Sequence, residues 1–162
     1  DFGLWGKFSL IFFLLLMFIG GCAGSTACGI KIFRLQMLLL FLKNQIKKLL
    51  SPNSVIITKY NNQKISENFI NSVIIFIFTF LFIFLIIAML LSISGLDFIT
   101  SISGAASSIS NVGPGLGDII GPNGNYKDIP DISKWILAFG MLLGRLELFA
   151  VLVLFFPSFW RN

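Results

Sequence analysis

Two long apolar segments dominate the second half of the chain, at residues 69–91 and 135–156. At 1.5 Å per residue, a helix over the first segment extends about 34 Å, which exceeds the bilayer hydrocarbon core of about 30 Å. Between them lie a short, more polar segment, residues 95–110, and the glycine-rich run NVGPGLG at residues 111–117. Helix-breaking backbone at membrane depth is tolerated only where protein buries it or where it lines an aqueous cavity. The pattern predicts a spanning helix, a short re-entrant helix, a glycine turn and a second spanning helix, which is the order of a pore loop.

The first half of the chain contains a broken apolar passage. Residues 5–19 are apolar but extend only about 22 Å as a helix, and apolar character returns at residues 30–42. The ten residues between them, GGCAGSTACG at 20–29, include no large side chain. We predict two half-helices joined by an intramembrane loop, because unwound backbone exposes the amide and carbonyl groups that transporters use at ion sites. The alternative is a helix-packing patch, in which the glycines allow a neighbouring helix to approach closely.

The connections between these segments are polar. Residues 43–68 contain turn signals and room for a short hairpin, and they either link two helices or dock a cytosolic partner. Residues 122–130, rich in Asn, Asp and Gly, are predicted to be an exposed loop. Asp97 is a good N-cap for the short helix that follows it, and Asp131 or Ser133 is expected to cap the last helix.

Composition and charge indicate a membrane protein. The chain is 56% hydrophobic and only 12% charged, whereas soluble domains are about a quarter charged. Most of the basic residues fall within residues 31–64, and residues 118–134 mix acids with bases. The positive-inside rule therefore puts the first region in the cytoplasm and the second outside, and this use of charge argues against a nucleic-acid partner.

Few residues are suited to metal binding or to catalysis. The chain has no His, and Cys22 and Cys28 are too few for a metal site, so we expect them to pack as small apolar residues. The Ser and Cys residues have no evident base, and no phosphate-binding glycine loop is present. The sequence predicts that the chain is not an enzyme.

The glycine turn carries the first candidate chemistry. Gly113 can adopt backbone conformations that aim consecutive carbonyl oxygens at one axis. Rings of such carbonyls replace the hydration shell of K⁺ or Na⁺, and one chain segment would supply a quarter of a fourfold ring. The alternative is a tight extracellular turn, for which Gly-Pro-Gly is ordinary sequence.

Arg145 carries the second candidate chemistry, since it lies midway along the apolar residues 135–156. A guanidinium near the bilayer centre costs about 2.5 to 3.5 kcal/mol on insertion scales, so it should face a cavity or a partner. It either controls how cations occupy a cavity below the turn or pairs with an intramembrane acid. Glu147 is a poorly placed partner at i, i+2 spacing, and its role stays open.

Three groups of residues together resemble the Trk/Ktr/HKT superfamily, and within it the TrkH-type potassium-translocating subunits of bacterial Trk systems. They are residues 20–31, the run at 111–117, and MLLGRLE at 141–147 with the FWR sequence at 159–161. The resemblance covers essentially the whole chain, in the same order.

This resemblance implies an all-α integral membrane fold with the M1-pore-loop-M2 repeat architecture of potassium channels. Four such repeats would surround one pore, and this chain would be a C-terminal fragment of a longer polytopic protein. Residues 1–50 would be the second transmembrane helix of repeat three, broken by an intramembrane loop at 20–29, residues 51–68 a cytoplasmic linker, and residues 69–162 repeat four. The implied parts of repeat four are M1 at 69–94, the pore helix at 97–110, the filter at 111–115, the outer loop at 116–132 and M2 at 133–156.

The same resemblance implies the site residues. The selectivity filter would comprise Asn111, Val112, Gly113 and Pro114, with K⁺ bound by the backbone carbonyls of Val112 and Gly113. Arg145 would be the charge that faces the pore. The gate beneath the filter would be the intramembrane loop, with Gly20, Gly21, Gly24, Ser25, Thr26, Gly29 and Lys31. The usual Thr-Gly-Gly-Gly of the family is replaced by TACG at residues 26–29, whose Ala and Cys restrict the backbone more than Gly does.

The implied function is potassium uptake across a bacterial inner membrane, with K⁺ as the transported ion and no covalently bound cofactor. Membrane lipid, a second copy of the protein and a cytosolic TrkA-like nucleotide-binding regulator are the implied partners, with residues 43–64 as a candidate docking face. The alternative is a non-conducting membrane assembly subunit whose glycines serve helix packing. An intramembrane enzyme that depends on Glu147 is a third hypothesis.

Overall fold

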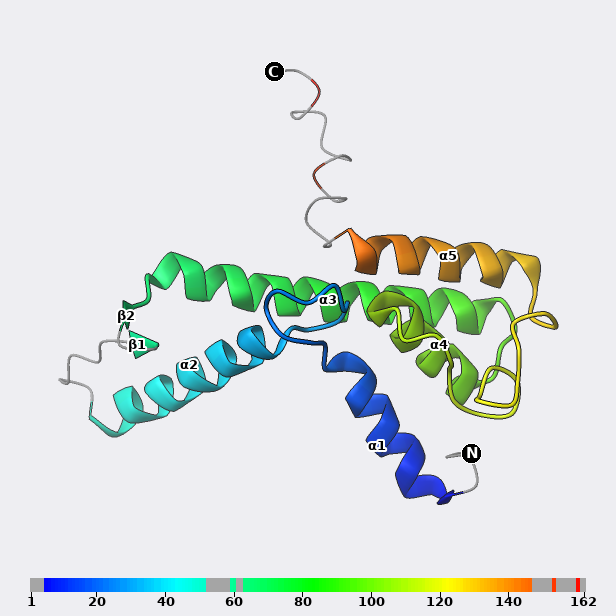
Figure 1. The fold of residues 1–162 in the computed structure, drawn as a ribbon, viewed down its shortest axis with the longest axis horizontal. Coiled ribbons are helices and arrows are strands. Elements are labelled where there is room, and N and C mark those ends of the chain that lie inside the picture. The colour runs from blue at the N-terminus through cyan, green and yellow to red at the C-terminus, as the bar shows by residue number, and fades with distance from the viewer. Residues whose placement is uncertain (1–4, 52–58, 61–62, 147–152, 154–159, 161–162) are drawn as a thin grey trace.

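The described residues fold into five helices and one minimal hairpin (Figure 1). The computed structural model describes residues 5–51, 59–60, 63–146, 153 and 160. The helices are α1 (Lys7–Phe18), α2 (Ile32–Leu50), α3 (Glu67–Ile93), α4 (Phe98–Ser110) and α5 (Asp131–Arg145). Strands β1 (Lys59–Tyr60) and β2 (Gln63–Lys64) pair antiparallel, with Lys59 opposite Lys64. The predicted all-helical fold class is confirmed, and the hairpin lies within residues 43–68, where the sequence left room for one.

The longest helix, α3, has the length and composition of a membrane span. It begins at Ser66, whose hydroxyl accepts a hydrogen bond from the Phe69 amide at 3.3 Å. An 18-residue stretch within Asn68–Ile93 has a mean hydropathy of 3.3, and within the described residues no other helix is both long and apolar enough to cross a bilayer. Outward side chains such as Phe78 are 71% exposed, as lipid contact requires.

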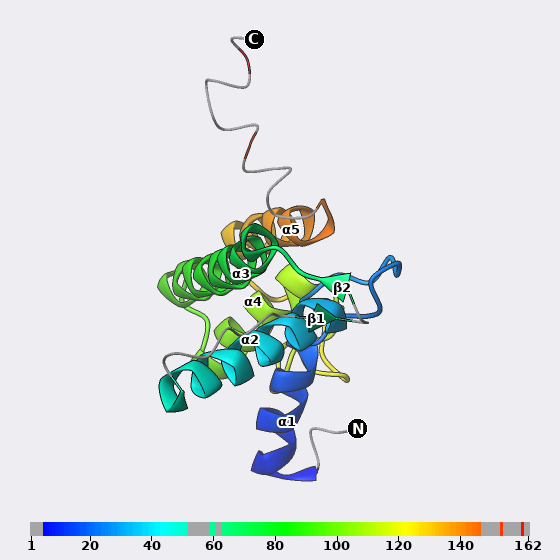
Figure 2. The same ribbon diagram turned by 90° about the vertical axis from the view of Figure 1, so that its left-hand side faces the viewer.

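The short helix α4 lies inside the bundle, in contact with α1, α3 and α5 (Figures 1 and 2). Ten of its 13 residues are buried, among them Ser101, Ser103, Ser107 and Ser108. The sequence predicted a helix too polar for lipid and suited to burial among other helices, and this is confirmed. As predicted, Asp97 caps the helix, with its carboxylate accepting a hydrogen bond from the Thr100 amide at 3.2 Å.

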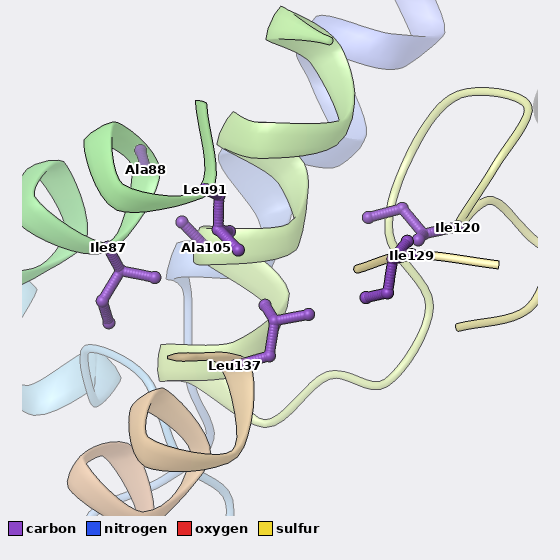
Figure 3. Close-up of a cluster of buried hydrophobic side chains, with 7 residues drawn as sticks. All are labelled: Ile87, Ala88, Leu91, Ala105, Ile120, Ile129 and Leu137. Atoms are coloured by element: carbon purple, nitrogen blue, oxygen red, sulfur yellow. The ribbon is translucent and has the colours of Figure 1, made fainter. Parts of the chain in front are cut away.

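An apolar cluster joins α4 to its neighbours and to the outer loop, residues 116–130. In Figure 3, Ile87, Ala88 and Leu91 come from α3, while Ile120 and Ile129 approach α4 from the loop on its other side. Ala105 of α4 and Leu137 of α5 complete the cluster. Because Ile120 and Ile129 are only 2% and 3% exposed, the outer loop packs onto α4 at two points.

Two glycines let α5 approach α4 closely. A Cβ at Gly140 would lie 2.8 Å from the Ser108 hydroxyl, and one at Gly144 would collide with the Ile109 carbonyl. Their i, i+4 spacing puts both on the same face of α5.

The start of α5 corrects one expectation. Its N-cap position is Pro130, and no side chain caps the helix. Ser133, predicted as a possible cap, is instead fully buried, and its hydroxyl bonds that of Ser94 at 2.7 Å. The Ser133 hydroxyl, which the sequence pattern assigned to the cap, is instead bonded to Ser94 at the end of α3. The predicted second span continues past α5 to residue 156, and of residues 147–156, Glu147 included, the structure describes Val153 alone.

Candidate functional site

The glycine turn begins where α4 ends. Asn111 has left-handed backbone angles (φ 51°, ψ 45°). Its amide donates to Ser108, and the Val112 amide donates to Ser107, which together form a Schellman motif. The Asn111 side-chain amide donates to the Met141 carbonyl of α5 at 3.0 Å. The end of α4, its partly negative pole, is thereby fixed at the start of the predicted filter.

Ser107 bonds both backbone groups of Gly113. Its hydroxyl accepts a hydrogen bond from the Gly113 amide at 3.2 Å and donates to the Gly113 carbonyl at 2.9 Å. Gly113 has φ 112°, a left-handed angle that side-chain-bearing residues rarely adopt, and the space around its Cα is open. Glycine is therefore required here for its backbone angle and not for lack of room.

The hydrogen bond from Gly113 sets the direction of the preceding carbonyl. In a trans peptide the C=O of one residue points opposite to the N–H of the next, and the described chain contains no cis peptide bond. Since the Gly113 amide points to Ser107 on α4, the Val112 carbonyl points away from α4. No described residue donates a hydrogen bond to the Val112 or Asn111 carbonyl oxygens, so both are open to a ligand.

The Gly113 carbonyl, which is predicted to bind an ion, accepts two hydrogen bonds from within the chain. The Tyr126 hydroxyl donates to it at 2.7 Å, in addition to the bond from Ser107. A carbonyl oxygen has two lone pairs, so both of its acceptor positions are used. Of the two predicted ligands, Val112 offers an open carbonyl and Gly113 does not.

Tyr126 was missed by sequence reasoning, which assigned residues 122–130 to an exposed loop. The side chain is half-buried and packs against the cluster that holds Ile120 and Ile129. Burial raises the pKa of its phenol, and the nearby Ser107 hydroxyl opposes this rise to a smaller extent. The phenol therefore stays protonated and can donate at neutral pH. The signal that could have found it is a lone aromatic residue in a loop of Asn, Asp and Gly.

A second serine of α4 repeats the contact made by Ser107. The Ser103 hydroxyl accepts from the Leu116 amide at 2.9 Å and donates to the Leu116 carbonyl at 3.2 Å. Ser103 and Ser107 are one helical turn apart and share a face of α4. Two buried hydroxyls thus bind the backbone at both ends of the segment 113–116.

The predicted intramembrane loop, residues 20–29, contains no helix. Its two ends meet in a parallel bridge between Ile19 and Ile30. The Ile30 amide donates to Phe18, and the Gly20 amide donates to Ile30, each at 2.9 Å. A Cβ at Gly20 would collide with the Cys28 carbonyl, so glycine is needed for this close approach. Cys22 and Cys28 are not joined in a disulfide.

Arg145 reaches the same loop from α5. Its guanidinium donates to the Thr26 carbonyl at 2.7 Å and lies 4.0 Å from the Cys28 sulfur. Within the loop, the Ala27 amide donates to the Ser25 hydroxyl, and the Lys31 ammonium donates to the Ala23 carbonyl. A cavity of about 240 Å³ separates the loop from α3 and α5, and Arg145 lines it. Arg145 therefore faces a cavity, and its hydrogen-bond partner there is the backbone of the loop.

A larger cavity, of about 400 Å³, joins the two predicted functional regions. One side is formed by Asn111, Val112 and Pro114 of the glycine turn, and the other includes Gly20, Gly21 and Cys28 of the loop. Gly113 is not among its lining residues. Ser110 also lines it, and within the described part of the chain its buried hydroxyl has no hydrogen-bond partner. The remaining predicted gate residues lie outside this lining, namely Gly24, Ser25, Thr26, Gly29 and Lys31.

A re-entrant helix, a glycine turn with open carbonyls, and a cavity that connects the turn to an unwound loop define a membrane transport protein of the pore-loop class. A sequence profile of the TrkH family, described as "Cation transport protein", matches residues 1–162. The chain belongs to the TrkH family. This is a family of transport proteins and not of enzymes, as the sequence predicted.

Relatives and a solved structure agree with this assignment. The chain is 47% identical over 162 residues to the Trk system potassium uptake protein TrkI of Halomonas elongata, covering all of this chain and 33% of that protein. It is 35% identical over 158 residues to the Trk system potassium uptake protein TrkH of Escherichia coli, covering 98% and 32%. The crystal structure of the potassium transporter TrkH from Vibrio parahaemolyticus superposes with a TM-score of 0.87 at 34% identity, covering 97% of this chain and 33% of that one. The chain spans about a third of the length of these relatives.

Proposed function

We propose that the protein to which this chain belongs takes up potassium ions across the inner membrane of a bacterium. The observation that carries the proposal is the shared cavity, in which the turn residues Asn111, Val112 and Pro114 face the loop glycines Gly20 and Gly21. An ion released by the turn would enter this space directly. The names of the relatives, which are potassium uptake proteins, give the choice of ion.

Residues 111–114 would form one of four segments of the selectivity filter. The open carbonyls of Asn111 and Val112 would replace part of the hydration shell of K⁺, and the C-terminal pole of α4 would favour the positive charge. Gly113 would contribute through its left-handed backbone and through its amide, whose bond to Ser107 leaves the Val112 carbonyl pointing away from α4. For the Gly113 carbonyl to bind the ion as well, one of its two hydrogen bonds would have to be released.

The loop at residues 20–29 would be the gate beneath the filter. Its hydrogen bond with Arg145 joins it to α5, the helix that also bonds Asn111 at the filter. Arg145 would thereby act on the pathway twice, through the charge that it adds to the cavity and through the position of Thr26. Gly24, Ser25, Gly29 and Lys31 would belong to the part of the gate that moves.

The assembly would be a homodimer in lipid, regulated from the cytoplasm by a TrkA-like nucleotide-binding subunit. The last two turns of α2 present Lys43, Lys47 and Lys48, all exposed, as the docking face. Basic residues at a helix C-terminus also stabilise the helix by themselves. Charge reversal therefore has to be compared with a neutral replacement. The neutral replacement removes the positive charges without adding negative charges that the partly negative end of α2 would repel.

The test is growth at low potassium of a bacterial strain without its own potassium uptake systems. The strain carries the full-length protein with Gly113 intact or replaced, Gly113→Asp. Gly95→Asp is the matched control, because Gly95 also has a left-handed angle (φ 93°) and open surroundings but lies in the turn between α3 and α4. Rescue by the native protein and by Gly95→Asp, but not by Gly113→Asp, supports a filter at residues 111–114. Rescue by Gly113→Asp would mean that the ion path avoids this turn.

A non-conducting assembly subunit is the second candidate function. The close approach of α5 to α4 at Gly140 and Gly144 favours it, since glycines at this spacing also serve helix packing. This function predicts no rescue by the native protein when the protein is present in the membrane. It also predicts that Gly113 and Arg145 variants change assembly and leave ion flux unaltered.

A further inference from the structure

The outer loop sends one side chain back to the glycine turn. Tyr126 lies thirteen positions beyond Gly113 in the sequence, and its hydroxyl donates to the Gly113 carbonyl at 2.7 Å. Ser107 donates to the same oxygen from the opposite element, α4. The carbonyl is therefore held between the pore helix and the outer loop.

This carbonyl belongs to a peptide unit that has no other polar group to hold it. The next residue is Pro114, which has no N–H, so the carbonyl oxygen is the only hydrogen-bonding atom of the unit between Gly113 and Pro114. Glycine adopts both signs of φ readily, and nothing lies within 4 Å of the place where a Gly113 side chain would begin. The two hydroxyls therefore hold the direction of this peptide through its oxygen alone.

The direction of the preceding peptide depends on the same contacts. The Gly113 amide must reach Ser107 for the Val112 carbonyl to point away from α4. The two peptides on either side of Gly113 share the Ser107 hydroxyl, so if the Gly113 carbonyl turns away, the hydroxyl loses its acceptor and is freer to leave the Gly113 amide. The Val112 carbonyl, which is the open one, then loses its fixed direction.

We propose that Tyr126 is a positioning residue of the selectivity filter, which works with Ser107 to hold the Gly113 peptide so that the Val112 carbonyl faces the ion. The proposal rests on the proposed function of residues 111–114. It adds a specificity-determining side chain from a loop that otherwise connects two helices.

The outer loop is built to keep Tyr126 in place. Ile120 and Ile129, on either side of it in the sequence, are buried in the cluster that includes Ala105 of α4 (Figure 3). The Gly115 amide donates to the Ile120 carbonyl at 2.7 Å, and Ser103 bonds both backbone groups of Leu116. Tyr126 therefore projects from a fixed loop, as a positioning residue must.

The experiment compares uptake of K⁺ and Na⁺ by the full-length protein and by its Tyr126→Phe variant, in the strain without potassium uptake systems. Phenylalanine keeps the ring and removes only the donor. Tyr60→Phe is the matched control, because Tyr60, on β1, also donates through its hydroxyl but to Gln36, away from the filter. Membrane abundance is measured for each variant.

The expected result is a fall in the ratio of K⁺ to Na⁺ uptake of about fivefold in Tyr126→Phe, the size that one net hydrogen bond gives. Abundance should be unchanged, and Tyr60→Phe should keep the native ratio. Ser107→Ala, which removes contacts to both groups of Gly113, should lower the ratio further, and Ser107→Thr, which retains a hydroxyl, should restore most of it.

A native ratio of K⁺ to Na⁺ uptake in Tyr126→Phe would overturn the inference alone. If uptake were also faster at that ratio, Tyr126 would be a brake and not a positioning residue. If Ser107→Ala fails to reach the membrane, Tyr126→Phe still decides the question. A native protein that takes up no potassium would overturn the proposed function and this inference together. Potassium uptake by the native protein, which is measured first, identifies this outcome.

Discussion

The replacement Gly144→Ala tests the packing of α5 against α4, which positions the proposed filter. Gly144 lies where α5 approaches α4 most closely, and a Cβ added there would collide with the Ile109 carbonyl. The obstacle is helix backbone and not a flexible side chain, so it cannot move aside locally. Overpacking of this kind costs about 1 to 3 kcal/mol, and we expect about 3 kcal/mol because α5 has to shift as a body.

The assay is thermal unfolding of the full-length protein in detergent, together with potassium uptake. Gly24→Ala is the control, since a Cβ at Gly24 meets nothing within 4 Å, and its effect should stay within about 0.5 kcal/mol. The shift of α5 should also weaken the bond between Asn111 and Met141, so uptake should fall together with stability. Equal melting temperatures for Gly144→Ala and Gly24→Ala would refute the close approach of α5 to α4.

Three further predictions concern the cap, the loop and the docking face. Asp97→Ala should lower stability by about 1 kcal/mol. Hydrogen bonds from Thr100 lower the pKa of Asp97, so the cap contributes fully above the ordinary carboxyl pKa and is lost only as pH falls through the lower folded value. The difference in melting temperature should therefore stay constant between about pH 5 and pH 8. Arg145→Gln should raise the rate of uptake at saturating potassium with no change in selectivity, because the loop loses its bond at Thr26 and the cavity loses a positive charge. An unchanged rate would contradict both proposed roles of Arg145. Charge reversal on α2 should abolish co-purification of a cytosolic regulator while neutral replacement only weakens it, and retention after reversal would exclude the docking face formed by Lys43, Lys47 and Lys48.

The sequence predicted those features that depend on local pattern. The Asp97 cap followed from residue type and position. Burial of the serines of α4 followed from a segment too polar for lipid and too short to cross it. The unwound stretch at residues 20–29 followed from ten consecutive small residues.

Features that depend on contacts between residues far apart in the sequence were not predicted. The polar composition of residues 122–130 indicated solvent exposure, but Ile129 and Tyr126 fold back onto α4 and the glycine turn. Ser133 has the residue type of a cap, yet it bonds Ser94, which lies 39 positions earlier. In each case a long-range partner competes with the local preference, and a single sequence carries no record of that partner.

The bridge between Ile19 and Ile30 has a mechanical consequence for the unwound segment. The backbone bonds at its base, from Ile30 to Phe18, from Gly20 to Ile30 and from Ile32 to Gly21, join the end of α1 to the start of α2. The ten residues between them form a closed flap whose two ends do not separate when its tip moves. In the proposed gate, displacement of the flap by an ion would therefore require no change in the spacing of α1 and α2.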